Sequence, residues 1–409
     1  MTAWRPGARL PALDGLRGVA ILGVMLYHQT LIGQSPAPVD RALALLPLGG
    51  WAGVDLFFVL SGFLITGILW DARGAEHAMR DFYARRVLRI FPLYYAVVAF
   101  ALLVLPNLPH PRAERWGQIA GDELWYWLFL SNFSIAASDA FRHGILDVSW
   151  SLAIEEQFYL LWPPLVLWMR RERLMRLCAA LVVGALAWRV GALLAGMSPF
   201  AVLVLTPGRV DGLAVGAFVA LAVRAPGGLE RLGRAAPVVV GASLAVLAGI
   251  AAHAGGLHAL DAGVQSAGFT ALASLWGGVL VLALTSARVA AALERPALMT
   301  LGRFSFALYL FHLPVRAALH AAIGPYERGL AVLGSFLPAQ LVFYAVSTAA
   351  TLGLAWLSWH LYEKRFLALK RHFGAPPHEE GRSPSPLRSA SPREAAVSPS
   401  HPAQCPTRS

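Results

Sequence analysis

A guanidinium and an imidazole share one face of the first long apolar segment, which runs from about residue 12 to 33. Arg17 and His28 are eleven positions apart, and eleven helical steps of ~100° bring the second side chain to within ~20° of the first. They are separated by ~16 Å along the axis, about half of the ~30 Å hydrocarbon thickness of a bilayer. Asp14 lies within ~40° of the same line. Because ionisable groups inside a membrane are costly and mark pathways or sites, this alignment predicts a functional track.

A second polar face occurs in the apolar segment of residues 150–169. Ser151, Glu155 and Tyr159 follow at intervals of four, and residues four apart are neighbours on a helix surface. The adjacent Glu156 is read as structural, because a carboxylate in the first turns of a helix is stabilised by the positive helix end. The three aligned side chains predict a polar site within the membrane.

A cluster of arginines precedes the apolar segment of residues 90–106. Arg86 and Arg89 are three positions apart and therefore share a helix face. Such cations also determine membrane topology, and a purely topological role is as good an explanation of them as a binding site. Paired guanidinium groups also hold phosphates in a bidentate manner that lysine cannot reproduce, so the pair is a candidate phosphate site.

The composition is that of a polytopic helical membrane protein. The chain has 409 residues, of which 57% are hydrophobic and 14% charged, whereas soluble domains carry ~25% charge. The net charge of +11 comes almost entirely from arginine, and its placement between apolar segments explains it without a nucleic-acid partner. Cys178 and Cys405 suggest no disulfide framework. The first apolar segment is too long and too polar for a cleavable signal peptide.

Apolar segments of spanning length predict an all-α transmembrane bundle of about ten spans. The shortest, near 208–223, is the weakest of them, and the apolar stretch 124–137 is better read as interfacial or re-entrant. The ten spans lie near residues 12–33, 51–70, 90–106, 150–169, 175–196, 208–223, 236–254, 265–286, 301–323 and 334–357.

Connections rich in arginine alternate with connections poor in cations, and by the positive-inside rule this places both termini in the cytoplasm. The segments 71–89 and 170–176 are rich in arginine, whereas 254–264 has none. This orientation puts Asp55 in the outer part of its span and Ser61 near the middle. We expect a membrane domain over residues 1–372 and a disordered Pro/Ser/Arg-rich cytoplasmic tail over 373–409.

A series of motifs in matching order resembles the acyltransferase 3 family of integral-membrane acyltransferases, which acylate sugars of bacterial surface and secreted molecules. The likeness covers about residues 10–370 and departs from the family only at Phe306, where Tyr is frequent, and Arg365, where Pro is usual. It rests on Leu13-Asp14-Gly15-Leu16-Arg17-Gly18, Tyr27-His28, Val54-Asp55-Leu56-Phe57-Phe58-Val59-Leu60-Ser61-Gly62-Phe63, Arg86-Val87-Leu88-Arg89, Trp150-Ser151-Leu152, Glu155, Phe158-Tyr159, Arg209-Val210-Asp211-Gly212-Leu213, Gly302-Arg303-Phe304-Ser305, Tyr309-Leu310-Phe311-His312 and Tyr362-Glu363-Lys364.

The resemblance implies transfer of an acyl group, often acetyl, from cytoplasmic acyl-CoA to a sugar hydroxyl at or beyond the membrane. It maps the family's signature arginine and histidine onto Arg17 and His28. His28 would accept the proton of the attacking hydroxyl, and Asp14, Asp55 or Glu155 would orient it. No metal and no permanently bound cofactor is expected, and any hydrolase-like partner domain would be a separate protein. Substrate binding is assigned to Arg17, Arg86, Arg89, Ser61, Ser151 and Tyr159.

Two other interpretations stay open at this point. In a transporter, His28 and the carboxylates would form a proton relay. In a different acyltransferase mechanism, Ser61 or Ser151 would be a covalent nucleophile, although Ser61 beside Gly62 is more simply explained by helix packing. The acceptor, the acyl chain length and the oligomeric state are also open; lipopolysaccharide, exopolysaccharide, lipid-linked sugars and glycosylated metabolites all fit.

Overall fold

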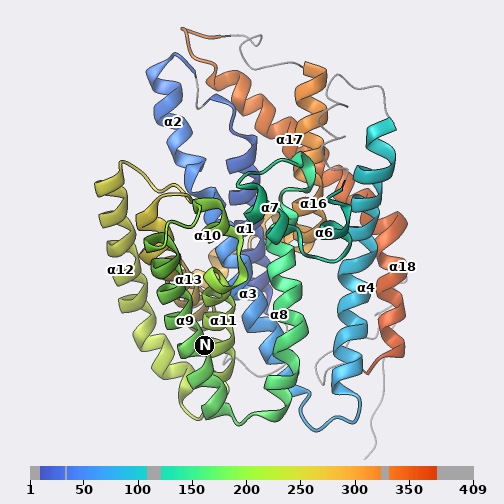
Figure 1. Ribbon diagram of the computed structural model, residues 1–409, viewed down its shortest axis with the longest axis vertical. Coiled ribbons are helices and arrows are strands. Elements are labelled where there is room, and N and C mark those ends of the chain that lie inside the picture. The colour runs from blue at the N-terminus through green and yellow to red at the C-terminus, as the bar shows by residue number, and fades with distance from the viewer. Residues whose placement is uncertain (1–9, 33–34, 108–120, 324–330, 375–409) are drawn as a thin grey trace, which may run out of the picture.

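The computed structural model describes residues 10–32, 35–107, 121–323 and 331–374, which form an all-helical bundle (Figure 1). Within these ranges the only β contact is an isolated bridge between Val332 and Ser335. The predicted fold class is therefore confirmed at the level of a polytopic helical bundle. Residues 375–409, which make up nearly all of the predicted tail, lie outside the described ranges, and the proposed division at residue 372 stays a prediction.

The longer helices follow the apolar segments of the sequence, and shorter ones connect them. Their bounds are α1 Pro11–Gln29, α2 Pro38–Leu48, α3 Gly53–Asp71, α4 Ala78–Ala99, α6 Glu123–Trp127, α7 Ser131–Ser138, α8 Ser149–Trp168, α9 Arg171–Leu194, α10 Pro199–Val204, α11 Val210–Ala222, α12 Gly228–Ala254, α13 Phe269–Thr285, α14 Ala287–Leu293, α15 Pro296–Arg303, α16 Ser305–Ile323, α17 Leu337–Ser358 and α18 Lys364–Ala368.

Six helical runs in the described residues are long and apolar enough to cross a membrane, and a bent pair of helices raises the number to seven. The pair is α15 and α16, which meet at 79°. The other three predicted spans correspond to α1, α8 and the short apolar helix α11. The six runs are Pro38–Asp71, Ala78–Asn107, Arg171–Leu194, Gly228–Ala254, Val264–Thr285 and Leu337–His372. The protein is a multi-pass membrane protein.

Three predicted boundaries are wrong. The arginine-rich segment 71–89 is mostly helix, because α4 begins at Ala78; arginine is a good helix former, so cations mark the membrane boundary and not the end of the helix. The predicted connection 34–50 contains α2. The predicted span 301–323 breaks at Phe304, where a bend brings Gly302 against the backbone of α1.

The centre of the bundle is built from α3 and α11, which are buried along most of their length. Their backbones touch at glycines: a Cβ on Gly62 would lie 1.9 Å from the carbonyl oxygen of Leu213, and one on Gly216 would lie 1.9 Å from that of Val59. Small residues at such crossings allow helices in a membrane to pack closely. The close packing predicted for Gly62 is therefore present.

We expect Gly62→Ala and Gly216→Ala each to destabilise the bundle by about 1–3 kcal/mol or more, because an added methyl must force the two backbones apart. Gly241→Ala is the matched control, since a Cβ at this exposed glycine in α12 meets no atom within 4 Å. Thermal unfolding of the detergent-solubilised protein measures the difference. Equal melting temperatures for all three variants would contradict the close contact.

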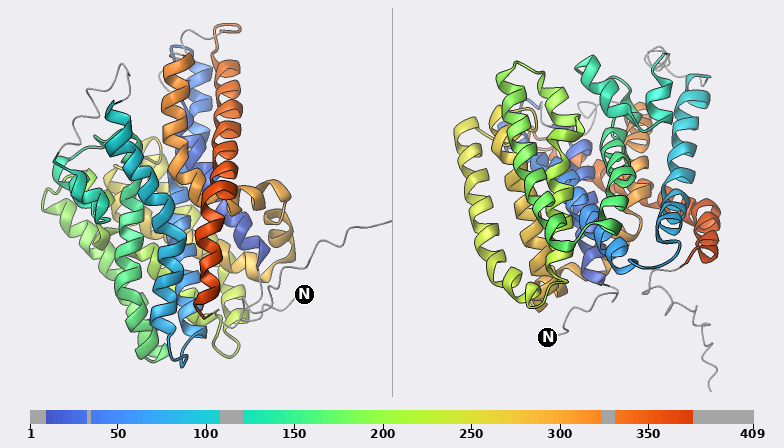
Figure 2. Two further views of the ribbon diagram at one scale, coloured as in Figure 1. Left: turned by 90° about the vertical axis from the view of Figure 1, so that its right-hand side faces the viewer. Right: turned by 60° about the horizontal axis from the view of Figure 1, so that its bottom comes forward.

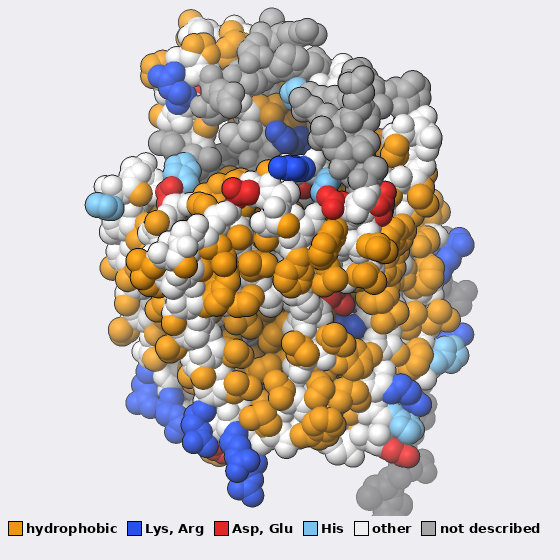
Figure 3. All heavy atoms as spheres, viewed as in Figure 1, with side chains coloured by type: hydrophobic (Ala, Val, Ile, Leu, Met, Phe, Trp, Pro, Cys, Tyr) orange, Lys and Arg blue, Asp and Glu red, His pale blue; other side chains and the backbone are white. Residues whose placement is uncertain are grey.

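Figures 1 and 2 show α9, α12 and α13 on one side of the central helices and α4 with α18 on the other. The space-filling view has a broad apolar belt around its middle and Lys and Arg side chains along its lower edge (Figure 3). The end of the described chain returns to the start of α4, where the Gly374 amide donates to Asp81 Oδ2 at 3.1 Å. The end of the described chain therefore lies beside the first turn of α4.

Candidate active site

Seven of the side chains singled out in the sequence line one pocket between α1, α3, α4, α8 and α16. The pocket has a volume of about 100 Å³, and we call it the arginine pocket. The side chains come from four helices that are far apart in the sequence. They are Arg17, Ser61, Arg86, Arg89, Ser151, Glu155 and Tyr159.

A chain of hydrogen bonds crosses the arginine pocket. The Tyr159 hydroxyl donates to Glu155 Oε2 at 2.9 Å, as expected for residues four apart on one helix face. Ser61 Oγ lies against the same hydroxyl. Because the tyrosine proton goes to the carboxylate, Ser61 is the donor in that contact, and its oxygen lone pairs stay available as acceptors.

The pocket carries an excess of positive charge. Arg17, Arg86 and Arg89 lie around it with Glu155 as the one carboxylate that lines it. Arg17 also pairs with Asp14 at 3.4 Å, and the Arg86 guanidinium lies 5.0 Å from the centre of the Tyr159 ring. An anion in a site shielded from solvent would therefore be bound strongly here, most of all a phosphate that can accept bidentate hydrogen bonds.

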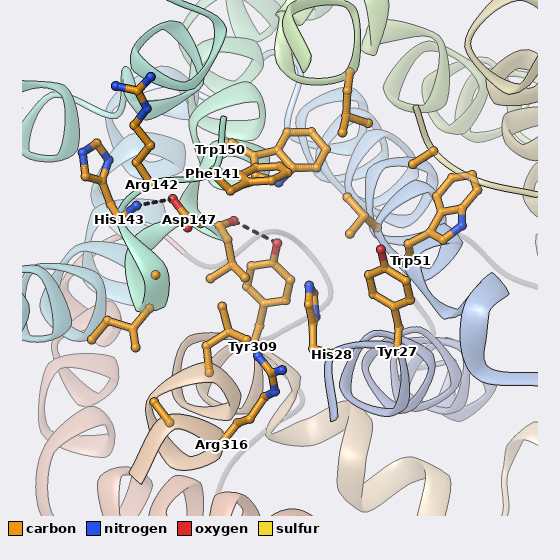
Figure 4. Close-up of a pocket in the computed structure, with 18 of the residues that line it drawn as sticks. Tyr27, His28, Trp51, Phe141, Arg142, His143, Asp147, Trp150, Tyr309 and Arg316 are labelled. Carbon is orange, nitrogen blue, oxygen red and sulfur yellow. Dashed lines mark hydrogen bonds between the residues drawn. The ribbon is translucent and has the colours of Figure 1, made fainter. Parts of the chain in front are cut away.

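A larger cavity of about 580 Å³, the histidine chamber, adjoins the arginine pocket (Figure 4). Rings of Tyr27, Trp51, Phe141 and Trp150 line it. Its polar lining consists of the side chains of His28, Arg142, His143, Asp147, Arg209, Arg316 and His320, together with the Tyr309 hydroxyl. A cavity of this size, mainly aromatic with a few polar groups, is typical of a binding site for a small organic group.

The loop before α8 forms one wall of the chamber and is tied in place. The His143 amide donates to Asp147 Oδ1 at 2.9 Å, and the His143 ring lies between the Tyr126 hydroxyl and Asp122, with Nε2 at 3.3 Å from Oδ2. Burial raises the pKa of Asp147 to about 6, although hydrogen bonds from the backbone act in the opposite direction. The wall is therefore preorganised.

His28 lies in the histidine chamber, on the side at which the chamber meets the arginine pocket. Tyr309 and Val54 line both cavities and separate them. The Tyr309 hydroxyl donates to the Val148 carbonyl at 2.9 Å and lies 2.7 Å from Ser151 Oγ. His28 Nδ1 is 3.0 Å from the Val24 carbonyl oxygen.

The carboxylates expected to orient His28 make other contacts. Asp55 Oδ1 pairs with Arg209 Nη2 at 2.8 Å, a buried ion pair that links α3 to α11. Asp14 pairs with Arg17, and Glu155 accepts from Tyr159. Each of these three carboxylates therefore has a partner other than His28, and orientation of His28 by one of them stays a prediction. The same geometry places Glu155 in one pocket with the three arginines.

The sequence interpretation named His312 within a motif but gave it no role, and its Nε2 lies 3.1 Å from His28 Nδ1. It is an ionisable residue within an apolar segment, so the criterion that selected His28 would have selected it too. Tyr309 was likewise named without a role, and the aromatic lining of the chamber was missed, because aromatic residues are common in membrane helices and at their ends. Within the described residues no group of three or more His, Cys, Asp or Glu side chains converges as metal ligands would.

Known proteins are similar in sequence to this chain over nearly all of its helical part. The family described as an acyltransferase domain, acyltransferase 3, matches residues 10–360. The structure defines the class of protein: a multi-pass helical bundle with a cationic pocket beside a histidine-lined chamber. The chain belongs to the acyltransferase 3 family.

Three curated relatives of this chain come from bacteria. Peptidoglycan O-acetyltransferase OatA of Listeria monocytogenes is 28% identical over 375 residues, which cover 83% of this chain and 55% of the relative. The putative peptidoglycan O-acetyltransferase YrhL of Bacillus subtilis is 37% identical over 163 residues, 38% of this chain and 23% of the relative. O-acetyltransferase OatA of Staphylococcus aureus is 34% identical over 163 residues, 38% of this chain and 24% of the relative.

The chain therefore spans about half the length of the Listeria relative, and its matches to the other two cover about a quarter of theirs. No solved structure matches the chain.

Proposed function

We propose that this protein is a membrane O-acyltransferase that moves an acyl group, such as acetyl, from cytoplasmic acyl-CoA to a hydroxyl of a carbohydrate. The observation that carries the proposal is the pair of adjoining cavities, one lined by arginines and the other by His28 and aromatic rings, which meet at Tyr309. The family supports the reaction class, and the names of the relatives support O-acetylation of a cell-surface glycan.

The arginine pocket suits the donor. Coenzyme A carries phosphates, and Arg17, Arg86 and Arg89 supply the guanidinium groups that would bind them at one end of the pocket. At about 100 Å³ the pocket has room for a thin chain such as pantetheine rather than for a nucleotide. The thioester would then reach the region of Tyr309 and His28 from the side of the arginines.

The histidine chamber suits the acceptor. Its aromatic rings present flat apolar faces to the C–H faces of a sugar, and its polar groups would hold hydroxyls. His28 would take the proton of the attacking hydroxyl as the oxygen bonds to the thioester carbon. The carbon–sulfur bond then breaks, and the leaving thiolate of coenzyme A receives the proton from His28, so that the ester and the free thiol are the products.

Direct transfer needs no acyl-enzyme intermediate. Ser61 donates its proton into the Tyr159–Glu155 chain, and Ser151 lies against Tyr309 without a histidine beside it among the described contacts. A serine nucleophile requires a base within hydrogen-bond reach. His28, in the wall of the chamber, is the base that this geometry favours.

The proposal is tested with purified protein in proteoliposomes, using labelled acetyl-CoA and soluble peptidoglycan fragments or other surface glycans as acceptors. We expect saturable acyl-CoA binding by calorimetry and a labelled O-acetyl ester that mild alkali removes. A transporter that uses His28 as a proton relay would bind no acyl-CoA and would instead carry a solute flux driven by a pH gradient. That outcome would overturn the proposal.

The proposed topology has ten spans with both termini in the cytoplasm of a bacterial inner membrane. The seven candidate spans together with α1, α8 and α11 make up this number. The cation-rich end of the bundle, which contains the turn between α3 and α4, would face the cytoplasm.

In a variant that lacks Cys178 and Cys405, we expect Glu76→Cys to react with an impermeant thiol reagent only after the cells are permeabilised. His258→Cys should react in intact cells. Both side chains are exposed, the first in the turn before α4 and the second in the connection after α12, so accessibility within the fold is matched. Labelling of Glu76→Cys in intact cells would refute the orientation.

A further inference from the structure

His312 occupies a position next to His28 from which it can act only through that residue. It is 0% exposed and lines neither the arginine pocket nor the histidine chamber. Its Nε2 lies 3.1 Å from His28 Nδ1, and the two rings are 5.0 Å apart with an angle of 42° between their planes. A substrate in the histidine chamber would therefore touch His28, and a substrate in either cavity would not touch His312.

The surroundings of His312 decide which of its nitrogens carries the proton. Its Nδ1 lies 2.7 Å from the Tyr309 carbonyl oxygen and 3.3 Å from that of Leu308. Carbonyl oxygens only accept hydrogen bonds, so Nδ1 of His312 must be the protonated nitrogen. In a neutral imidazole the other nitrogen is then an acceptor, and His312 Nε2 presents a lone pair to His28.

This lone pair in turn decides the tautomer of His28. Both neighbours of His28 Nδ1, the Val24 carbonyl oxygen and His312 Nε2, are acceptors. The proton of a neutral His28 is therefore on Nδ1, and its Nε2 is left as a lone pair. The Val24 carbonyl is on the same helix, four residues before His28, where it also accepts the backbone hydrogen bond of the helix. His312 approaches from α16 and fixes the plane of the His28 ring.

We propose that His312 is a positioning residue that holds His28 as the Nδ1–H tautomer, with Nε2 free to accept the proton of the acceptor hydroxyl. The proposal rests on the acyltransferase function proposed above. In this pair a neutral imidazole takes the place that a carboxylate has beside the histidine of many catalytic sites, where it sets the tautomer and stabilises the imidazolium. The same hydrogen bond from Nδ1–H to His312 strengthens when His28 becomes charged, because bonds from charged donors are stronger.

The test compares His312→Phe with His312→Gln in nanodiscs. Phenylalanine keeps the shape of the ring and removes the acceptor, so we expect kcat to fall about 10- to 100-fold with the KM for acyl-CoA unchanged, less than the 10²–10⁴-fold contribution of a general base. Glutamine offers its side-chain oxygen to His28 Nδ1–H and should restore most of kcat. His360→Phe is the matched control, because its Nδ1 also bonds a backbone carbonyl, that of Trp356 at 2.8 Å, at a site away from both cavities.

Nitrogen-15 NMR of histidine-labelled protein provides a measurement that needs no turnover. We expect Nδ1–H for both His28 and His312 in the wild type, and a growing Nε2–H population of His28 in His312→Phe. A wild-type His28 in the Nε2–H form would overturn the proposal, and so would full activity of His312→Phe. A fall in activity that glutamine does not restore, without any change in the tautomer of His28, would show that the role is only structural. Failure of the wild type to acylate any acceptor would instead count against the proposed function.

Discussion

Replacing His28 with alanine should reduce acyl transfer by about 10²–10⁴-fold, because the variant loses the group that accepts the proton of the attacking hydroxyl. The residue lies on α1 in the wall of the histidine chamber, beside Tyr309 (Figure 4). Tyr309 also lines the arginine pocket, from which the donor would reach His28. The partner His312 stays in place in this variant. Product formation per unit of purified protein, with acetyl-CoA and a glycan acceptor, is the measurement.

His253→Ala is the control for this experiment. His253 is exposed in the last turn of α12 and contacts neither cavity, so its replacement should leave transfer at the wild-type level. Binding of acyl-CoA to His28→Ala should also stay close to normal, since the arginines are intact. A normally inserted His28→Ala protein that makes product at the wild-type rate would remove His28 from the mechanism.

Replacing Arg86 or Arg89 with alanine should mainly weaken acyl-CoA binding. A hydrogen bond to a charged group contributes about 1.5–3 kcal/mol, so each loss should raise the Kd roughly 10- to 100-fold. Lysine should restore the affinity only in part, because a point charge cannot reproduce the planar fork of a guanidinium. The reacting atoms lie near His28 and should be little affected, so kcat at saturating acyl-CoA should change less than KM.

Arg85→Ala is a matched control on the same helix. Arg85 does not line the arginine pocket, and its guanidinium donates to the carbonyls of Lys370 and Phe373 at 3.3 Å. Its replacement removes these two contacts and should leave the Kd for acyl-CoA unchanged in calorimetry.

Glu155→Gln should have the opposite effect, lowering turnover and not acyl-CoA affinity. The amide oxygen can still accept from Tyr159, while one negative charge leaves a pocket that binds an anion, so acyl-CoA affinity should be retained. Turnover should fall, because a neutral amide holds the Tyr159 and Ser61 hydroxyls more weakly than the carboxylate does. Loss of binding in Glu155→Gln together with normal binding in the Arg86 and Arg89 variants would contradict the donor assignment.

Several features of this protein could be predicted from local sequence, because they depend on one helix at a time. Hydropathy predicted the multi-pass helical class, since a bilayer requires long apolar helices. The period of 3.6 residues predicted that Ser151, Glu155 and Tyr159 share a face, and the structure gives Tyr159 and Glu155 a hydrogen bond. The track on α1 likewise has Arg17 in one cavity and His28 in the next.

Helix ends were harder to predict, because the polar residues that mark a membrane boundary do not end a helix. Arg80, Arg85, Arg86 and Arg89 lie on α4, and α2 occupies a segment expected to be a connection. The break at Phe304 depends on how Gly302 meets the carbonyl of Asp14 on α1, a contact between residues 288 apart in numbering that no local pattern encodes.

Contacts between helices were decided by the tertiary structure alone. The sequence by itself supplied His28 and a choice of three carboxylates to orient it, whereas packing of α16 against α1 brought His312 to His28 across 284 positions. Packing of α3 against α11 likewise brought Asp55 into an ion pair with Arg209, 154 positions away in the sequence. The physical reason is that helical periodicity states which way a side chain points around its own axis, while the partner it meets depends on which helix lies opposite and at what height.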